Sequence, residues 1–328
     1  MRRVLIMSCL LIGLVSAISI QADFPQAHIT NGVIQATLYL PDAKNGYYQG
    51  TRFDWSGVIG SLTYKEHNYF GPWFEKHDPK IHDAITGPVE AFVPIGYEQA
   101  KPGDDFVIIG VGALRKGDAP KYHFANPYEI TNPGKWSVSK KKDQVQFVHE
   151  LKEATGYSYR YQKNVRLVKG KPQLILEHRL KNTGSRSIET KTYNHNFFVI
   201  DKEPTGPGIL TTFPFEVEAK GGLGKEGLAE VQSKQIVYLR QLQKGENAFN
   251  NNVQGFGTTA KDYDFRIENQ KSGAGVRITG DQPLSKIVFW SCYTTSCPEP
   301  YIDIQAKPGE EITWNITYEF YTLPNSSK

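Results

Sequence analysis

One histidine in the sequence has neighbours that place it on a rigid element. His195 follows Asn194, and the apolar run 197–200 begins two residues after it. That run is short and rich in aromatic and β-branched residues, which is typical of a buried strand. An imidazole can donate or accept a proton near neutral pH, so this histidine is a candidate for acid–base catalysis. The alternative is a buried histidine whose hydrogen bonds serve only the fold.

The elements that must position this histidine are predicted to be strands. Apolar and polar residues alternate over 34–40, 157–167, 174–180 and, most regularly, 312–320. The 30 Gly and 19 Pro residues supply turn signals at short intervals between such runs. Many strands joined by tight turns indicate an all-β sandwich or barrel-like fold. No shift in composition marks a boundary, so we expect one large domain.

The N-terminus has the form of a secretory signal peptide. An Arg-Arg pair precedes the apolar stretch 4–20, and small-residue cleavage sequences end at Ala17 and Ala22. Removal of residues 1–22 would leave 23–328 as the mature domain, exported to the periplasm or the cell exterior. The alternative is a membrane anchor, which the cleavage sequences disfavour. No later segment is apolar enough to cross a membrane, so we expect no stable span after removal.

Charge and cysteine content exclude several classes of protein. Loss of Arg2 and Arg3 would lower the formal net charge of +4 by two, which leaves too little charge to favour binding to nucleic acid. Cys292 and Cys297 are the only cysteines after the signal peptide, so the chain is not a disulfide-rich scaffold. In an exported protein we expect this pair to form one disulfide that closes a small loop. Histidine spacing gives no zinc motif, and we expect neither a metal nor a cofactor.

Aromatic residues suggest a ligand with both apolar and polar faces. They make up 12% of the chain, and several fall in loop-like stretches rather than in strands. A pyranose has an apolar face and a polar rim, so exposed rings beside polar groups are suited to hold sugars. The alternative is ordinary packing beneath long loops. The aromatic residues in question are Trp55, Tyr69, Trp73, Tyr122 and Trp136.

The stretch 180–184, Leu-Lys-Asn-Thr-Gly, is followed at 193–198 by Tyr-Asn-His-Asn-Phe-Phe. Together they resemble the central motif of the aldose 1-epimerases (galactose mutarotases), in which L-x-N-T-G leads to N-H-x-x-F with the catalytic histidine. The resemblance extends over roughly 31–323 and identifies the chain as similar to the galactose mutarotase-like superfamily. It implies a β-supersandwich fold, and it implies that His195 is catalytic.

Other stretches resemble the same family in the same order along the chain. Gly-Thr-Arg-Phe at 50–53, Ile-His-Asp at 81–83 and Asp-Tyr-Asp-Phe at 262–265 match segments that carry sugar-binding residues. The family's double glycine after its first histidine is replaced here by Asp83-Ala84. The resemblance implies that four residues contact the sugar: Arg52, His82, Asn194 and Asp262.

Two carboxylates are candidates for the catalytic base. The segment 301–305, Tyr-Ile-Asp-Ile-Gln, resembles the family's L-E-T-Q segment and places Asp303 at the glutamate position, one methylene shorter. Glu299 is the rival, since a proline on each side holds it stiffly. We favour Asp303, because alternation projects it to the same face as Tyr301 and Gln305, where the three could reach one pocket.

The resemblance implies isomerisation at the anomeric carbon of a sugar. His195 would donate a proton to the ring oxygen while a carboxylate takes the proton of the anomeric hydroxyl. One alternative is a non-catalytic carbohydrate-binding protein on the same fold, and another is a polysaccharide lyase or hydrolase. In each case the expected partner is a mono- or oligosaccharide.

Overall fold

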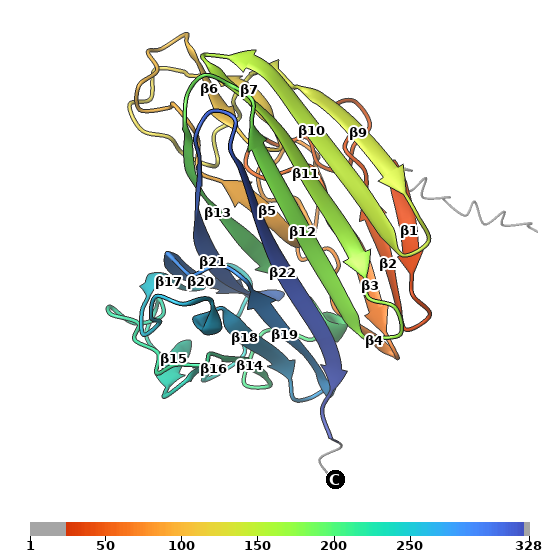
Figure 1. The fold of residues 1–328 in the computed structure, drawn as a ribbon. Coiled ribbons are helices and arrows are strands. Elements are labelled where there is room, and N and C mark those ends of the chain that lie inside the picture. Colours follow the sequence, from red (N-terminus) through yellow and green to blue (C-terminus); the bar gives the residue numbers. More distant parts are fainter. Residues whose placement is uncertain (1–23, 325–328) are drawn as a thin grey trace, which may run out of the picture.

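The computed structural model describes residues 24–324, so the predicted signal peptide at 1–22 lies outside the described residues. Over the described range the regular secondary structure is almost entirely β-strand, with two short 3-10 helices, η1 (Ile200–Lys202) and η2 (Ala260–Asp262). The all-β prediction is therefore confirmed (Figure 1). No helix in the described part has the length and apolarity needed to cross a membrane.

The largest sheet has ten strands, and its long central strands form the broad layer that faces the viewer in Figure 1. Neighbouring strands pair antiparallel. In spatial order the strands are β15 (Ala229–Gln232), β16 (Gln235–Tyr238), β14 (Ile209–Thr212), β18 (Asp264–Asn269), β19 (Ala274–Gly280), β22 (Glu311–Thr322), β12 (Gln173–Asn182), β11 (Tyr157–Leu167), β10 (Gln144–Ala154) and β9 (Lys135–Lys140).

A second, five-stranded sheet lies behind this layer. Its strands in spatial order are β17 (Ala248–Val253), β20 (Lys286–Cys292), β21 (Thr295–Ala306), β13 (Ile188–Phe197) and β5 (Gly87–Phe92). Two smaller sheets complete the domain. One contains β1 (Gln26–Thr30), β2 (Ile34–Tyr39), β3 (Val58–Tyr64) and β4 (His67–Asn68), and the other contains β6 (Asp105–Ile108), β7 (Gly112–Arg115) and β8 (Ile130–Asn132).

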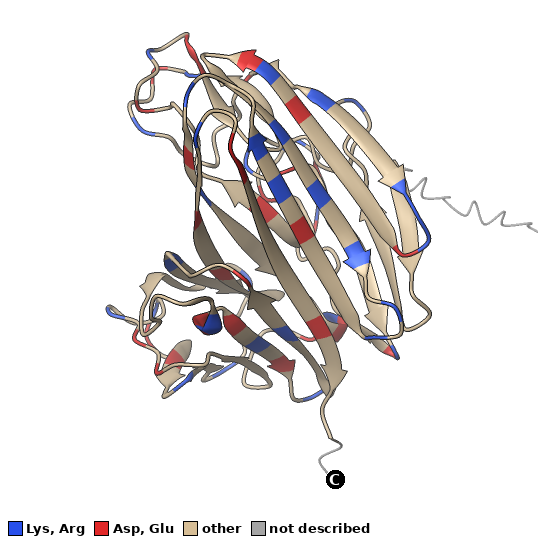
Figure 2. Ribbon diagram, viewed as in Figure 1, with Lys and Arg blue, Asp and Glu red and all other residues tan. Residues whose placement is uncertain are grey.

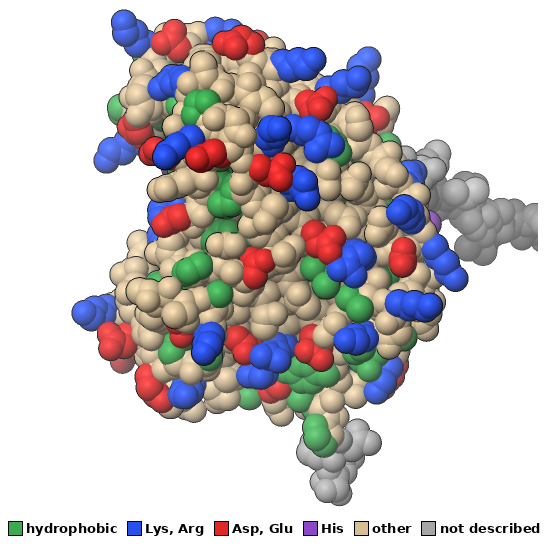
Figure 3. All heavy atoms as spheres, in the orientation of Figure 1, with side chains coloured by type: hydrophobic (Ala, Val, Ile, Leu, Met, Phe, Trp, Pro, Cys, Tyr) green, Lys and Arg blue, Asp and Glu red, His purple; other side chains and the backbone are tan. Residues whose placement is uncertain are grey.

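The alternation in the sequence sorts these strands into a core face and an outer face. The four predicted alternating runs correspond to β2, β11, β12 and β22. Charged residues recur along the strands of the ten-stranded sheet (Figure 2), and partly exposed ion pairs such as Arg166–Glu177 and Arg277–Asp264 link neighbouring strands. Figure 3 shows both signs of charge interspersed over the visible surface. The outer face is therefore a solvated surface, and the apolar faces meet inside.

Strand β13 differs in its end point from the sequence prediction. The run 197–200 was expected to form the strand, but β13 ends at Phe197 and η1 begins at Ile200. The backbone turns to positive φ at Asp201 and Lys202, at 55° and 58°, which an extended strand cannot contain. Asn194 and His195 therefore lie inside a central strand, paired on one side with β5 and bordered on the other by β21.

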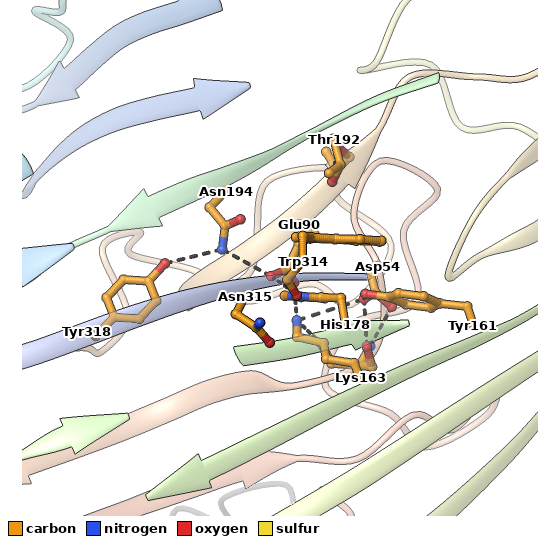
Figure 4. Close-up of polar contacts among 12 residues, drawn as sticks. Asp54, Glu90, Tyr161, Lys163, His178, Thr192, Asn194, Trp314, Asn315 and Tyr318 are labelled. Carbon is orange, nitrogen blue, oxygen red and sulfur yellow. Dashed lines mark hydrogen bonds and ion pairs between the residues drawn. The ribbon is translucent and has the colours of Figure 1, made fainter. Parts of the chain in front are cut away.

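A network of buried charges lies between the two large sheets (Figure 4). Asp54, Glu90, Lys163 and His178 are each fully buried or nearly so. The Lys163 ammonium forms an ion pair with Glu90 and lies 3.8 Å from Asp54. Nε2 of His178 lies 3.0 Å from the second oxygen of Glu90. Burial opposes the charge on Glu90, but Lys163 and His178 outweigh it and lower its pKa to about 2.

This network holds the strand that carries the predicted catalytic histidine. The amide of Asn194 donates to Glu90 over 3.0 Å and to the hydroxyl of Tyr318, on β22, over 3.2 Å. Tyr318 donates in turn to the amide oxygen of Asn196 at 2.8 Å. Because side chains alternate along a strand, His195 projects to the opposite face of β13. The back of the strand is thus fixed by hydrogen bonds, and its front faces away from the ten-stranded sheet.

Candidate functional site

A cavity of about 410 Å³ lies on this front face of the five-stranded sheet. That volume is within the range of small-molecule sites. Its floor consists of alternate residues of three neighbouring strands: Tyr193, His195 and Phe197 of β13, Glu299 and Tyr301 of β21, and Lys286, Val288 and Trp290 of β20. Its walls come from β17 and from three loops: Phe249, Asn251, Arg52, Trp73, His82, Asp83 and Phe124.

Strand register brings His195 and Glu299 together. Tyr193 pairs with Tyr301 in antiparallel strands; His195 lies two residues after Tyr193, and Glu299 lies two residues before Tyr301. They are therefore opposite each other on one face of the sheet. Nε2 of His195 lies 3.2 Å from Oε1 of Glu299, and both side chains are almost completely buried. The His195 ring also stacks on Phe197, with 3.8 Å between ring centroids, which fixes its plane.

Burial moves the pKa values of this pair in opposite directions. Burial, followed by the nearby Arg52, holds the pKa of His195 well below its usual value of 6.5. Burial raises the pKa of Glu299 to about 8, although Arg52 and Lys286 act in the other direction. We therefore assign the one shared proton to Glu299 at neutral pH, with its O–H donating to Nε2 of His195. Nδ1 then carries the ring hydrogen.

The other ring nitrogen of His195 contacts a thiol. Sγ of Cys297 lies 2.8 Å from Nδ1, and burial raises the pKa of this thiol well above its usual value. Cys297 is completely buried and does not line the cavity. With the ring hydrogen on Nδ1, Sγ accepts it, and this contact fixes the orientation of the imidazole toward Glu299. A nucleophilic role is disfavoured, because a thiol with a raised pKa carries little thiolate.

The predicted disulfide is wrong in this structure, where Cys292 and Cys297 are both free. Cys292 pairs with Thr295 across the β20–β21 hairpin, and Cys297 pairs with Trp290. The cysteines are therefore diagonal neighbours, for which the typical separation is about 7–8 Å. A disulfide requires the Cα atoms to be within about 6.8 Å, so closing the bond would distort the hairpin.

We predict that the purified protein contains two free thiols at Cys292 and Cys297. Both are buried, so they should react with an alkylating reagent only after denaturation. Intact-mass measurement after alkylation, with and without prior reduction, tests this: the two samples should gain the same mass in denaturant. Modification only after reduction would show that the disulfide forms and that the hairpin register differs.

The histidine, the thiol and the carboxyl group at this site are also residue types that bind metal ions. His195, Cys297 and Glu299 offer ligand atoms that all lie within 4.8 Å of one another. However, the thiol approaches Nδ1 and the carboxyl approaches Nε2, on different edges of one ring. A tetrahedral ion needs each ligand to direct a lone pair at one centre. The arrangement therefore fits a chain of hydrogen bonds better than an ion site.

The cavity brings together four of the seven predicted site residues. His195, Glu299, Arg52 and His82 all line it. Arg52 donates from Nη2 to the hydroxyl of Tyr193 over 3.2 Å, and its guanidinium lies 4.2 Å from the centre of the Phe124 ring. Burial lowers the pKa of His82, so this imidazole is neutral at pH 7.

The other three predicted residues lie elsewhere. Asn194 belongs to the core network on the back of β13. Asp262, in η2, accepts a hydrogen bond from the backbone of Gly257 and does not line the cavity. Asp303 forms a solvent-exposed ion pair with Lys191, and 58% of its side chain is exposed. The expectation that Asp303 reaches the pocket is therefore wrong, and Glu299 is the carboxylate beside the histidine.

The sequence analysis missed most of the cavity's aromatic lining. Of the five loop aromatics, only Trp73 lines the cavity, where it stacks on Phe197 with 5.0 Å between ring centroids. Tyr193 and Tyr301 form a second stacked pair at 4.2 Å, and Trp290 also belongs to the floor. The available signal was the period-two spacing of these rings with His195 and Glu299 on neighbouring strands.

Comparison with solved structures identifies the fold. No family model matches the chain, and no curated protein matches it. Solved structures do match: the Slr1438 protein of Synechocystis sp. PCC 6803 has a TM-score of 0.57 at 13% identity, covering 94% of this chain and 99% of that one. A galactose mutarotase related enzyme from Lactobacillus acidophilus has a TM-score of 0.55 at 12% identity, covering 92% and 99%.

A third similar structure is a GalM/aldose epimerase homologue from C. elegans, with a TM-score of 0.52 at 15% identity. It covers 91% of this chain and 99% of that one. Identities this low show a shared fold and leave the activity open. The described chain is thus a single domain with the galactose mutarotase-like fold, as the resemblance of its sequence motifs predicted.

Proposed function

We propose that the protein is an aldose 1-epimerase-like isomerase that interconverts the anomers of a sugar bound in the cavity. One observation carries this proposal: His195 and Glu299 form a buried pair, 3.2 Å apart, that holds one proton at neutral pH. Anomer interconversion needs one group that gives a proton and one that takes a proton at the same time. The shared fold and the aromatic lining support a sugar as the ligand.

The pKa directions favour roles opposite to those implied by the resemblance. Glu299 donates its proton to the ring oxygen, while Nε2 of His195 takes the proton of the anomeric hydroxyl. The bond between the anomeric carbon and the ring oxygen breaks, which leaves an open-chain aldehyde. Rotation about the adjacent carbon–carbon bond and the reverse proton transfers close the ring on the other face. Each turnover returns the pair to its starting protonation state.

The test is to measure anomer exchange and binding in parallel on a panel of sugars. Polarimetry on a freshly dissolved pure anomer should show faster equilibration with the protein, and calorimetry should show binding of the same sugar. Absorbing unsaturated products would indicate a lyase, and a gain of reducing ends would indicate a hydrolase. If no sugar binds and none exchanges its anomers faster with the protein, the proposal is contradicted.

A non-catalytic sugar-binding protein is the second candidate, and one observation favours it. The two reactive groups contact each other directly, so a sugar must separate them before it can accept a proton from one and donate to the other. Binding without faster anomer exchange, in the presence of saturating sugar, would select this alternative.

We predict a pH profile set by the buried pair. Turnover should be constant near neutral pH, where the pair holds one proton, and should fall about tenfold per unit above roughly pH 8, as Glu299 ionises. The acid limb should lie well below pH 6.5, because the pKa of His195 is lowered. Initial rates measured over the acid and alkaline ranges test this. An alkaline midpoint near 6.5 would contradict the assignment.

We also propose that the protein is exported and loses residues 1–22. The proposal rests on the basic start, the apolar stretch and the cleavage sequence at Ala22. Amino-terminal sequencing of the mature protein from the native cells should begin at Asp23, and an intact Met1 in the exported fraction would contradict it.

A further inference from the structure

Two cations line the cavity without an acidic partner. Neither Arg52 nor Lys286 has a carboxylate within ion-pair distance among residues 24–324, although both line the cavity. Nε of Arg52 is buried and has no hydrogen-bond partner in the described chain. The Lys286 ammonium lies 5.5 Å from the centre of the Tyr301 ring. Buried donors are normally satisfied, so a guanidinium that lines a cavity with an unpartnered Nε–H and no carboxylate partner points to an external acceptor.

The acidic groups of the cavity do not balance these charges at neutral pH. Glu299 is mostly protonated, since burial raises its pKa to about 8. Asp83 is the remaining lining carboxylate, and it lies beside His82, with 3.9 Å between Oδ1 and Nδ1. His82 and His195 are neutral, because burial lowers both pKa values. Two cations and one carboxylate therefore leave an excess of positive charge in a partly dry cavity, where electrostatic interactions are strong.

The cations could instead serve only to ionise Glu299. Both do act in that direction, yet burial outweighs them and the carboxyl remains protonated at neutral pH. Neither forms an ion pair with it, and Arg52 is held away by its hydrogen bond to Tyr193 and by the ring of Phe124. Arg52 is therefore fixed in an orientation that leaves donors free for a ligand.

We propose that the ligand is an anionic sugar, whose negative group lies at Arg52 and Lys286 while its anomeric centre reaches His195 and Glu299. A guanidinium presents a planar fork of donors that matches carboxylate, sulfate and phosphate groups, and an ammonium adds a point charge. The inference rests on the proposed function, because it places the reacting carbon of the sugar at the proton-sharing pair. It makes Lys286 a specificity-determining residue that the sequence motifs did not indicate.

The experiment compares one sugar with its charged derivatives. Galactose, galacturonate, galactose 6-phosphate and galactose 6-sulfate are titrated into the protein by calorimetry, and anomer exchange is followed by NMR. We expect at least one anionic form to bind about tenfold or more tightly than galactose, with an affinity that falls as salt is raised. The three anionic arms distinguish a carboxylate from a phosphate or sulfate ester.

The matched variants are Lys286→Gln and Lys307→Gln, which replace a cavity lysine and a solvent-exposed lysine. Lys286→Gln should reduce the preference for the anionic sugar about tenfold, and Lys307→Gln should preserve it. Equal binding of galactose and its anionic forms, or an unchanged preference in Lys286→Gln, would overturn the inference while the proposed function stands. If no neutral or anionic sugar binds or exchanges faster, the inference and the proposed function both fail.

Discussion

Replacement of Glu299 by glutamine is expected to lower the rate of anomer exchange by about 10²–10⁴-fold, the usual contribution of a positioned acid or base. Glutamine keeps the size of the side chain and still hydrogen-bonds to Nε2 of His195. It cannot donate and recover a proton, so the pair can no longer serve a reaction that needs both groups. Polarimetry at saturating sugar measures the loss, and calorimetry should show that the sugar still binds.

Two further variants make this result specific. His195→Asn should lower the rate of anomer exchange by a similar factor. The double variant should lower it little further, because the two groups act as a unit. Asp303→Asn should retain full activity, since its carboxylate is exposed and paired with Lys191 outside the cavity. Loss of activity in Asp303→Asn with an active Glu299→Gln would mean that the carboxylate role is assigned to the wrong residue.

Replacement of Lys163 by methionine should destabilise the fold by about 3–5 kcal/mol, which is typical when one partner of a buried ion pair is removed. Lys163 is completely buried, and its ammonium is shared by Glu90, Asp54 and the carbonyl of Ser56. Methionine fills a similar volume but leaves Asp54 without its ammonium partner and Glu90 with His178 alone. Urea unfolding followed by tryptophan fluorescence measures the change.

Lys181→Met is the matched control, because this lysine is on the exposed face of β12, next to the strand that carries Lys163. Its effect should stay within about 0.5 kcal/mol, as for most surface substitutions. Adding Glu90→Gln to Lys163→Met should recover part of the lost stability, since it removes a buried negative charge that has lost its ammonium partner. If Lys163→Met were as mild as the control, the buried network would carry little of the fold's stability.

The sequence was sufficient for the fold class, because alternation depends on local order alone. The runs that became β2, β11, β12 and β22 each show which residues face the core. The central motif also placed His195 on a buried strand. These signals depend on the two-residue period of a strand, which is the same whichever strand lies beside it.

The sequence analysis favoured the wrong carboxylate because alternation shows which face of a strand a residue lies on, but not how far along the strand the cavity extends. The alternation itself holds, since Ile302 and Ile304 are buried and Asp303 lies on the opposite face. However, β21 is twelve residues long, and only Glu299 and Tyr301 of this strand line the cavity. The extent of the cavity is set by loops that carry Arg52 and Phe124, and these are remote in sequence.

The buried network and the free cysteines depend on register between strands. Nothing near Lys163 in the chain indicates that it meets Glu90, which is contributed by another sheet. Likewise, the spacing of Cys292 and Cys297 fits a small ring, but the hairpin pairs them diagonally. Long-range pairing of this kind is a property of the assembled sheets, and a single sequence contains little direct signal for it.

Because β13 is paired on both sides and fixed from behind by Glu90 and Tyr318, the floor of the cavity is the least deformable part of the site. The opening is bordered instead by loop and edge-strand side chains, including Phe124 and Phe249, which are 43% and 46% exposed. Slow amide exchange is therefore expected in β13, and faster exchange in the loop around Phe124. Ligand entry and departure would then be governed by the walls, while the geometry of proton transfer stays constant from one turnover to the next.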